Sequence, residues 1–382
     1  MPQHDVLIVG GGPSGSTLAW ALRQQGMDVA IIDKQAFPRD KVCAGWITPA
    51  VLASLKIDVD DYQRHNLLQP IHGFRVGRIS GGMKDIDYPD GPVSYAIRRC
   101  EFDHYLLKRS GATLYTETKV ASLQQVAHQW ILNGDYSAPL LVGAGGHFCP
   151  VARHLGAKLG KAEIAVTAQE IEFAMSATQA AACPVVADTP ELFFCDDLQG
   201  YGWVVRKQDY LNIGLGRTDN HRLSEHVEAF VAQLKSQGRI PQDTPAQFHG
   251  HAYLCYPQAV RQLAADGVLL IGDAAGLAYP ESGEGIRPAI ESAILAAGVI
   301  RNSAPSYRQA QLAAYPALVQ QRFGQRATAL SAQVGGNVLI NQARIAIGKA
   351  LLASHWFSRH VVVNRWFLHQ QQPPLLLQEG TA

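Results

Sequence analysis

The sequence predicts an α/β fold that combines a parallel-sheet domain, a β-sheet domain and a helical C-terminal segment. Two observations predict the first domain: a strand, a glycine-rich turn and a helix follow one another at residues 5–33 and again at residues 267–300. The third observation concerns the second domain. Apolar and polar residues alternate between residues 163 and 256, as in GYGWVVRKQDYLNIGLG, and this alternation is typical of β-strands.

The first pattern is DVLIVGGGPSGSTLAWALRQQGMDVAIID, residues 5–33. Its glycines stand in G-x-G-x-x-G spacing after a β-branched run, and a second apolar run ends at an aspartate. The glycines allow a tight turn, a close approach of a pyrophosphate and close helix–strand packing, while the helix N-terminus offers free N–H groups to phosphates. We predict an adenine dinucleotide here, in preference to an ordinary βα turn. The predicted binding residues are Gly10, Gly12, Pro13, Ser14, Gly15, Asp33 and Lys34.

The second pattern is GVLLIGDAAGLAYPESGEGIRPAIESAILAA, residues 267–297. An acid at the end of a strand can bind the ribityl chain of a flavin. A glycine-rich helix N-terminus can lie beside the flavin N1, where reduction builds negative charge. The alternative is a second βα turn without a ligand. The predicted binding residues are Gly272, Asp273, Pro280, Gly283, Gly285 and Ile286.

Size and composition are those of an ordinary globular protein. The chain has 382 residues, 47% apolar and 17% charged, which suffices for two domains with cores of their own. No apolar run approaches about 18 residues and the N-terminus leads directly into a strand, so we expect a cytoplasmic protein that does not span a membrane. The net charge of +1 by itself indicates no class of partner, and we expect no nucleic-acid partner.

Cysteine and histidine spacing predicts no metal site. The six cysteines are scattered without a C-x-x-C pair, so neither a zinc site nor a disulfide framework is indicated. His249 and His251 form an H-x-H pair, but no further ligand cluster accompanies them. A polar strand is the better interpretation of this pair.

The remaining elements set the domain boundaries. Helices are expected at 51–55, 102–108 and 226–236, glycine-separated strands at 71–97, and helices from about residue 307 up to a frayed tail, QQQPPLLLQEGTA. We assign residues 1–70, 96–156 and 257–320 to the parallel-sheet domain, 71–95 and 157–256 to the β-sheet domain, and 321–382 to the C-terminal segment.

From residue 5 to about residue 300, the chain resembles FAD-dependent oxidoreductases of the p-hydroxybenzoate hydroxylase fold, and among them the geranylgeranyl reductase family. Both patterns above contribute to the resemblance. Arg99-x-x-Phe102-Asp103 is similar to the family's R-x-x-F-D helix start, where the arginine lies near the cofactor, and GAGGHFCPVARHLG (143–156) to its G-A-D-G-x-x-S-x-V-R motif. KVCAG at residues 41–45 resembles the reductases' K-x-C-x-G loop, and YGW at 201–203, followed by Gly214 and Gly216, their Y-x-W strand.

The resemblance implies a Rossmann-like domain that holds FAD noncovalently and a β-sheet substrate domain. It implies reduction of carbon–carbon double bonds in a hydrophobic, isoprenoid-like substrate. Further cofactor contacts are then expected from Lys41, Cys43, Ala44, Gly45 and Arg99, and catalytic roles from Cys43, as the proton donor, and from Tyr201 and Trp203, as walls of an apolar cavity. The alternatives are a buried cysteine that acts as a small hydrophobe and an ordinary aromatic pair in a sheet core.

One departure concerns the electron donor. Gly145 stands where the family's D-G turn has an aspartate, and Cys149 where it has a serine. The aspartate can touch the path of the pyridine nucleotide in hydroxylases, and this chain has no second G-x-G-x-x-G. Both NAD(P)H at a transient site and a protein electron donor therefore stay open.

Three other functions share the motifs. An aromatic or polyketide monooxygenase on the same fold is the main alternative, since the K-x-C-x-G loop and the Y-x-W strand alone separate it from a reductase. A flavin-dependent halogenase is a weaker alternative, because the W-x-W-x-x-I-P signature is absent. A non-catalytic flavin-binding module would not require an aromatic-lined second domain.

The C-terminal region is basic. Between Ser292 and Gln378 there is no Asp or Glu, while eight Lys and Arg residues occur, and apolar residues recur at roughly helical spacing. Such helices can lie on anionic lipid, which predicts a peripheral membrane contact or a site for an anionic head group. The alternative is a helical cap packed on the flavin domain. The apolar positions are Leu352, Trp356, Val363 and Phe367.

Overall fold

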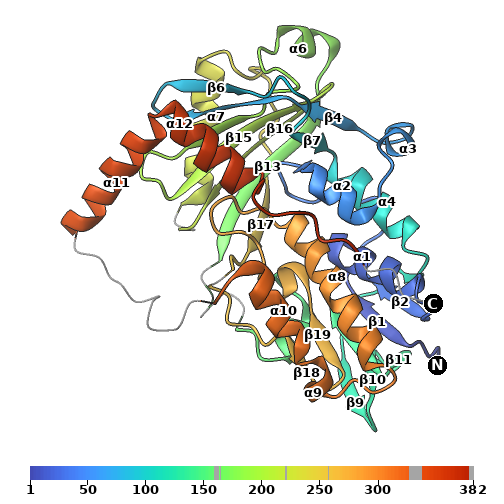
Figure 1. The fold of residues 1–382 in the computed structure, drawn as a ribbon. Helices are drawn as coiled ribbons and strands as arrows, with labels where there is room; N and C mark the ends of the chain where they lie inside the picture. The colour runs from blue at the N-terminus through green and yellow to red at the C-terminus, as the bar shows by residue number, and fades with distance from the viewer. Residues whose placement is uncertain (159–162, 164, 220–221, 257, 327–337, 378–382) are drawn as a thin grey trace.

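The computed structural model describes residues 1–382 except 159–162, 164, 220–221, 257, 327–337 and 378–382 (Figure 1). Two large sheets form the two halves of the molecule, with the six-stranded sheet in the lower part of Figure 1 and the seven-stranded sheet in the upper part. The predicted α/β class, with a flavin-type nucleotide domain, a sheet domain and C-terminal helices, is confirmed.

The six-stranded sheet forms the core of the nucleotide domain. Its strands are parallel except for one antiparallel pair at an edge, β18 (Ala264–Ala265) with β19 (Val268–Leu270). The central strands are apolar and buried along their whole length, because both faces of the sheet lie within one core. The order is β18 (Ala264–Ala265), β19 (Val268–Leu270), β12 (Leu140–Gly143), β1 (Val6–Val9), β2 (Val29–Ile32) and β8 (Thr113–Tyr115).

Four helices accompany the strands of the nucleotide domain. The helix α1 packs on both α4 and α8, and the short helix α5 follows β12. Both sequence patterns therefore form neighbouring strand–turn–helix units of one domain. The bounds are α1 (Pro13–Arg23), α4 (Arg99–Arg109), α5 (Pro150–His154) and α8 (Ile286–Ser303).

The seven-stranded sheet forms the second half. All its pairs are antiparallel except β14 with β5, which are parallel. The helix α7 (Leu223–Ser236) covers one face with its apolar side, and α6 (Ala177–Ala182) lies in a connection. The order is β17 (His249–Tyr253), β13 (Val166–Ala174), β16 (Tyr210–Arg217), β15 (Gly200–Lys207), β14 (Glu191–Phe194), β5 (Gly73–Arg78) and β6 (Met83–Asp87).

Two small antiparallel sheets complete the fold. One extends the nucleotide domain at its base, and the other carries the end of the KVCAG loop and packs on two short helices. The first consists of β9 (Leu123–Val126), β10 (Gln129–Leu132) and β11 (Tyr136–Ala138), and the second of β3 (Trp46–Ile47), β4 (Leu68–Ile71) and β7 (Ser94–Ile97), with α2 (Pro49–Leu55) and α3 (Val59–Gln63).

The C-terminal segment contacts both halves. The first two helices follow α8, and residues 352–368 pack on the face of the seven-stranded sheet opposite α7, while the preceding helix projects away from it (Figure 1). Leu352, Val363 and Phe367 are buried in that contact, whereas Trp356 is 64% exposed. The cap therefore packs mainly on the sheet domain. Its elements are α9 (Gln309–Leu312), α10 (Ala314–Phe323), α11 (Val338–Leu352), α12 (His355–Phe357) and the π-helical segment η3 (Ser358–Phe367).

The tail up to residue 377 does not fray as expected. The buried guanidinium of Arg287 donates hydrogen bonds to the carbonyl oxygens of Gln372 and Pro373, and Leu375 and Leu377 pack against the cores. A buried arginine needs acceptors, and the tail backbone supplies them. Residues 378–382 lie outside the described part of the chain.

Two further observations bear on the sequence-based expectations. All six cysteines lie within the described residues and are free thiols. None of the helices in the described ranges is both long enough and apolar enough to cross a membrane.

Candidate active site

A cavity of about 320 Å³ lies where the two halves meet. The glycine turns of the nucleotide domain line one end, the KVCAG loop lines the middle, and aromatic side chains from the sheet domain and η3 line the other end. The cavity brings together most of the residues that the sequence predicted as a site.

The first turn presents backbone at the cavity. Gly10 has a φ of 114°, and a Cβ atom there would lie 2.4 Å from the carbonyl oxygen of Ala144. Gly12 precedes α1, and no side chain in the described residues caps that helix, so its first N–H groups face the cavity. A Cβ atom on Gly15 would lie 1.9 Å from the carbonyl oxygen of Gly10, so this glycine lets α1 pack against β1.

Asp33 and Arg39 flank this turn. The carboxylate of Asp33 accepts hydrogen bonds from the N–H of Gly11 at 2.8 Å and of Gln35 at 2.9 Å, which orients it at the cavity edge beside Lys34. The guanidinium of Arg39 lies over the turn, and its buried Nε has no hydrogen-bond partner among the described residues. This end therefore offers a carboxylate acceptor suited to a ribose and a cationic guanidinium with a free Nε–H donor suited to a phosphate.

A polar triad lies beyond the turn. Nζ of Lys41 is 2.8 Å from Nε2 of His251, which is 3.6 Å from Oδ2 of Asp273. Burial lowers the pKa of Lys41 to about 8 and also lowers the pKa of His251. Burial by itself would raise the pKa of Asp273, but the hydrogen bond with His251 and the charge of Lys41 outweigh it and lower that pKa to about 2. Asp273 is therefore a carboxylate that faces the cavity.

Arg99 forms a buried pair behind the KVCAG loop. Its Nε and Nη2 each donate to the carboxylate of Asp103 at 2.9 Å, and Arg39 approaches the same carboxylate at 3.4 Å. Burial alone would lower the pKa of Arg99, but the charge of Asp103 and the nearby Cys43 raise it, so the guanidinium stays cationic. The R-x-x-F-D spacing thus places a fixed positive charge next to the loop.

Cys43 stands between the two ends of the cavity. Its thiol lines the cavity and accepts a long hydrogen bond, 3.4 Å, from the N–H of Gly45. Gly45 has a φ of 69°, and a Cβ atom there would lie 2.4 Å from Nζ of Lys207. Only glycine fits this close approach between the loop and the sheet.

The sheet end of the cavity is aromatic. The rings of Tyr201 and Trp203 are 5.9 Å apart, and Phe367 of η3 lies 5.2 Å from Tyr201 and 5.9 Å from Trp46. The hydroxyl of Tyr201 donates to the carbonyl oxygen of Ser282, and burial raises its pKa, so this phenol keeps its proton. Tyr201 and Trp203 line the cavity together with Trp46 and Phe367, which the motifs did not assign to the site.

Gly214 explains part of the Y-x-W pattern. It pairs with Trp203 across β15 and β16, and a Cβ atom there would lie 2.2 Å from the indole ring. The glycine therefore leaves the space that the Trp203 indole occupies.

The second helix N-terminus closes the polar side. Gly285 precedes α8, and a Cβ atom there would lie 3.0 Å from Oδ1 of Asp273. Glu284 lines the cavity without a hydrogen-bonded partner for its carboxyl oxygens in the described ranges, and His369 lies 3.4 Å away. Burial raises the pKa of Glu284 to about 7.

Three predicted residues do not line the cavity. Gly15 and Gly272 act through packing, since a Cβ atom on Gly272 would lie 2.8 Å from Oγ of Ser14. Pro280 is exposed and lies outside the cavity lining, whereas Gly283 and Gly285 after it line the cavity, so its contact with the cofactor stays a prediction.

Several further residues that line the cavity were not predicted from the motifs. The H-x-H pair predicts a polar strand, and the structure places it on β17. His251 lies on the face of that strand that lines the cavity. Glu284 stands inside the second quoted pattern and Arg39 two residues before KVCAG, and His147 and Phe148 follow Gly145 at the cavity edge.

The cavity fits FAD. Two open helix N-termini, glycine cradles that a Cβ atom would fill and the unpaired Nε of Arg39 suit a pyrophosphate, and the Asp273 carboxylate suits a ribityl hydroxyl. The family model described as an FAD binding domain matches residues 3–302. The chain belongs to this FAD-binding family.

Two relatives and one solved structure agree with this assignment. The chain is 30% identical to the menaquinone reductase of Mycobacterium tuberculosis over 346 residues, 84% of this chain and 80% of that protein. It is 25% identical to the digeranylgeranylglycerophospholipid reductase of Methanocaldococcus jannaschii over 317 residues, 78% and 76% of the two chains. A geranylgeranyl bacteriochlorophyll reductase-like protein from Thermoplasma acidophilum shares the fold, with a TM-score of 0.72 and 20% identity over 99% of this chain and 94% of that one.

The comparisons confirm the family resemblance and the cofactor. The protein is an FAD-dependent oxidoreductase related to geranylgeranyl-type reductases. In this family member, the residues around Gly10, Gly12 and Gly285 would hold FAD through backbone N–H groups, and Asp33 and Asp273 would hold it through carboxylates.

Proposed function

We propose that the protein reduces carbon–carbon double bonds of a hydrophobic, isoprenoid-like lipid. The observation that carries the proposal is the aromatic end of the cavity, directly beside Cys43 and continuous with the nucleotide end. The names of the relatives support the same substrate class, since menaquinone and digeranylgeranylglycerophospholipid both describe molecules with prenyl chains. An apolar chain would lie against the rings of Trp46, Tyr201, Trp203 and Phe367.

When it is bound, reduced FAD supplies a hydride to one carbon of the double bond, and the other carbon requires a proton. Cys43 is the proposed donor, with the proton held at Sγ. The thiolate left behind would lie beside the cationic Arg99, which stabilises negative charge at this point. Tyr201 and Trp203 orient the chain and exclude water; their own protons are already donated within the protein. The protein is then reset by uptake of one proton at Cys43 and by an external reductant, either NAD(P)H or a protein donor.

Anaerobic single turnover tests this function. The full-length FAD-loaded protein is photoreduced without oxygen, mixed with menaquinone or digeranylgeranylglyceryl phospholipid, and the lipid is analysed by mass spectrometry. We expect a gain of two hydrogen atoms per reduced bond, with flavin reoxidation of equal yield. Oxidised enzyme serves as the control.

Other outcomes would contradict the proposal. A monooxygenase would leave the lipid unchanged without oxygen and would form a hydroxylated product after oxygen is admitted. A halogenase would form a halogenated product that depends on both oxygen and halide. A protein that takes up no FAD would exclude all three enzymes.

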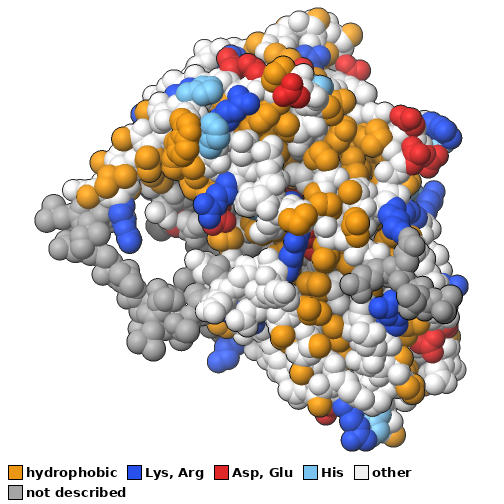
Figure 2. Space-filling model, in the orientation of Figure 1, with side chains coloured by type: hydrophobic (Ala, Val, Ile, Leu, Met, Phe, Trp, Pro, Cys, Tyr) orange, Lys and Arg blue, Asp and Glu red, His pale blue; other side chains and the backbone are white. Residues whose placement is uncertain are grey.

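We also propose that the C-terminal segment docks the enzyme on anionic membranes, from which such a lipid would enter. Ile347, Leu351 and Trp356 are exposed on α11 and α12, and Figure 2 shows apolar side chains gathered over these helices with basic ones nearby. Arg344 and Lys349 lie on the same α11. The combination of an apolar ridge and positive charge is typical of peripheral lipid binding.

Co-sedimentation with vesicles tests this contact. We expect binding to anionic vesicles at low salt, weaker binding to zwitterionic ones, and a loss of about tenfold in the double variant Ile347→Ser, Trp356→Ser, since two large apolar side chains leave the interface. Val186→Ser removes an exposed apolar side chain from the sheet domain and is the matched control. Equal sedimentation of the double variant, or no binding of the original protein, would refute the contact.

A further inference from the structure

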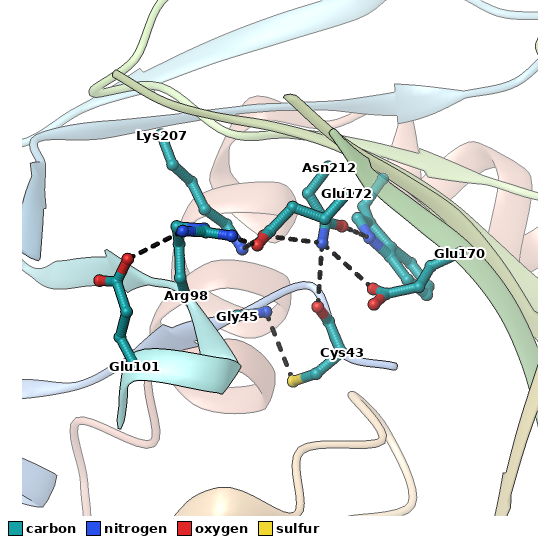
Figure 3. Close-up of polar contacts among 9 residues, drawn as sticks. Cys43, Gly45, Arg98, Glu101, Glu170, Glu172, Lys207 and Asn212 are labelled. Atoms are coloured by element: carbon teal, nitrogen blue, oxygen red, sulfur yellow. Dashed lines mark hydrogen bonds and ion pairs between the residues drawn. The ribbon is translucent and has the colours of Figure 1, made fainter. Parts of the chain in front are cut away.

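Asn212 lies at the centre of a buried polar network behind the cavity wall (Figure 3). It stands on β16 directly opposite Glu172 of β13 and Val205 of β15 in the strand register. Glu170 is two residues from Glu172, so both carboxylates point to the same face of the sheet as the Asn212 amide. Antiparallel register therefore gathers these side chains beneath the KVCAG loop.

The orientation of the Asn212 amide is determined by its partners. The indole N–H of Trp203 can only donate, and it donates to Oδ1 of Asn212 at 2.7 Å. The amide nitrogen consequently faces three oxygen atoms: the carbonyl oxygen of Cys43 at 3.1 Å, Oε2 of Glu170 at 3.2 Å and Oε2 of Glu172 at 3.3 Å. One side chain thus connects the aromatic wall to the loop that carries the thiol.

Two cationic side chains also contact the carboxylate of Glu172. Nζ of Lys207, whose side chain is fully buried, lies 2.5 Å from Oε2 of Glu172. Arg98 contacts the other oxygen of Glu172 at 3.2 Å and Glu101 at 2.9 Å. Because Arg98 immediately precedes α4, the network links the sheet domain to the helix on which Arg99 lies.

We propose that Asn212 is a positioning residue for the reaction, which holds the Cys43 loop at a fixed distance from the Trp203 wall. The position that Asn212 gives the loop does not depend on the proposed function. Only its expected effect on turnover rests on that function. Asn212 does not line the cavity, so it acts through Cys43 and Trp203, which do. Loss of the amide donor would leave the Cys43 carbonyl and two carboxylates without their shared partner, and the loop would separate from the wall.

Asn212→Asp is the most discriminating variant. It keeps the shape and the acceptor for Trp203, but its carboxylate cannot donate and repels Glu170 and Glu172. When protonated, the new carboxyl regains one O–H donor. The charged and titratable groups around it are Glu170 and Glu172 from β13, Lys207 from β15, Arg98 before α4 and Cys43 on the loop. His249 and His251 stand on the next strand, β17, opposite Glu170 and Ala168 of β13.

The readout is the reaction of Cys43 with N-ethylmaleimide in the full-length protein, with and without FAD, followed by peptide mass spectrometry. Cys183, which is partly exposed at the end of α6, is the internal reference thiol. We expect Cys43 in the Asn212→Asp protein to react roughly five- to tenfold faster than in the original protein at pH 8, as the loss of one hydrogen bond implies. The ratio should fall toward one as the pH is lowered, because burial beside Glu170 and Glu172 favours the protonated form of the new carboxyl.

Two further variants complete the test. The first provides a second measurement if Asn212→Asp is unstable, and the second is a control. Trp203→Phe removes the indole donor, frees the amide to turn, and should raise Cys43 reactivity in the same direction by a smaller factor. Gln169→Leu removes an amide on the opposite face of β13, where it bonds Ser224, and should change nothing. Folding is checked by circular dichroism.

The outcomes separate the two proposals. Unchanged Cys43 reactivity in a folded Asn212→Asp protein, or a ratio that does not vary with pH, would overturn the positioning role. A pH-dependent rise in Cys43 reactivity, with no double-bond reduction by the original protein, would uphold the positioning role and refute the proposed function.

Discussion

The two ends of the cavity are built in different ways. The nucleotide end presents mainly backbone: two glycine turns and two uncapped helix N-termini face the cavity. The glycines fit there because they carry no Cβ atom. The sheet end presents side chains, and their positions depend on partners from several strands, as with Asn212 and Trp203.

This difference predicts how each end responds to change. At the nucleotide end, adding a single Cβ atom does damage because backbone atoms cannot move aside. At the sheet end, the sensitive property is charge and hydrogen bonding, because buried carboxylates and an amide share donors. The following substitutions test that contrast.

Gly15→Ala should have the largest effect, on folding itself. The new Cβ atom would lie 1.9 Å from the carbonyl oxygen of Gly10, and only movement of α1 away from β1 relieves the overlap. We expect a loss of about 3 kcal/mol or more in the free energy of unfolding, measured with urea. Gly12→Ala is the matched control, since its nearest neighbour would be Nη2 of Arg39 at 3.4 Å. It should retain stability but bind FAD more weakly; equal losses of stability would contradict the packing argument.

Glu170→Gln should change the pH dependence of stability. Burial raises the pKa of Glu170 to about 7, so folding favours its protonated form. The stability that protonation supplies is complete below the unfolded pKa near 4.5 and is lost as the pH rises toward 7. Relative to Glu170→Gln, the original protein should therefore lose on the order of 3 kcal/mol between pH 4.5 and 8.

Urea unfolding at several pH values measures this difference. Glu228→Gln alters an exposed residue of α7 and should follow the original protein at every pH. A constant difference between Glu170→Gln and the original protein would show that Glu170 does not titrate in this range.

Cys43→Ser tests the point where the two ends meet. Serine keeps the shape and the contact with the N–H of Gly45 but is a far weaker acid, so we expect turnover to fall roughly a hundredfold. FAD affinity should remain the same, because the nucleotide end is untouched. Unchanged turnover and an unchanged product distribution would remove Cys43 from the mechanism.

Asp273→Asn should have the smallest effect and should act on the cofactor alone. Asn preserves the size of the side chain but removes the charge that Lys41 and His251 face. We expect FAD affinity to fall about tenfold, as for the loss of a charge-assisted hydrogen bond, measured by quenching of flavin fluorescence. Asp135→Asn, on an exposed turn, is the control. Unchanged affinity would show that the carboxylate does not hold the ribityl chain.

The nucleotide end could be predicted well because its signals are local. A turn, a helix start and the acid at the next strand end depend on residues within one βαβ unit, so Gly10, Gly12 and Asp33 could be assigned from spacing alone. Asp273 could be placed at the cavity in the same way, from its position after a strand, whereas Pro280 is exposed outside the lining.

The sheet end could be predicted only in part. The YGW run indicated Tyr201 and Trp203, and the resemblance indicated Cys43. His251 was visible only as part of an H-x-H pair on a strand, and nothing near Glu170 or Asn212 in the sequence indicated a role for either. All three come from other strands.

The sequence by itself thus determined the α/β class, the FAD fingerprint and the family, because these are written in short runs whose backbone conformation follows from glycine spacing and apolar periodicity. Only the tertiary structure decided the polar partners of the site. Asn212 meets Cys43 across 169 positions of the chain, and Lys41 meets His251 across 210. Such contacts depend on strand register and on how two domains pack, and a buried polar atom is satisfied by whichever partner that packing brings near.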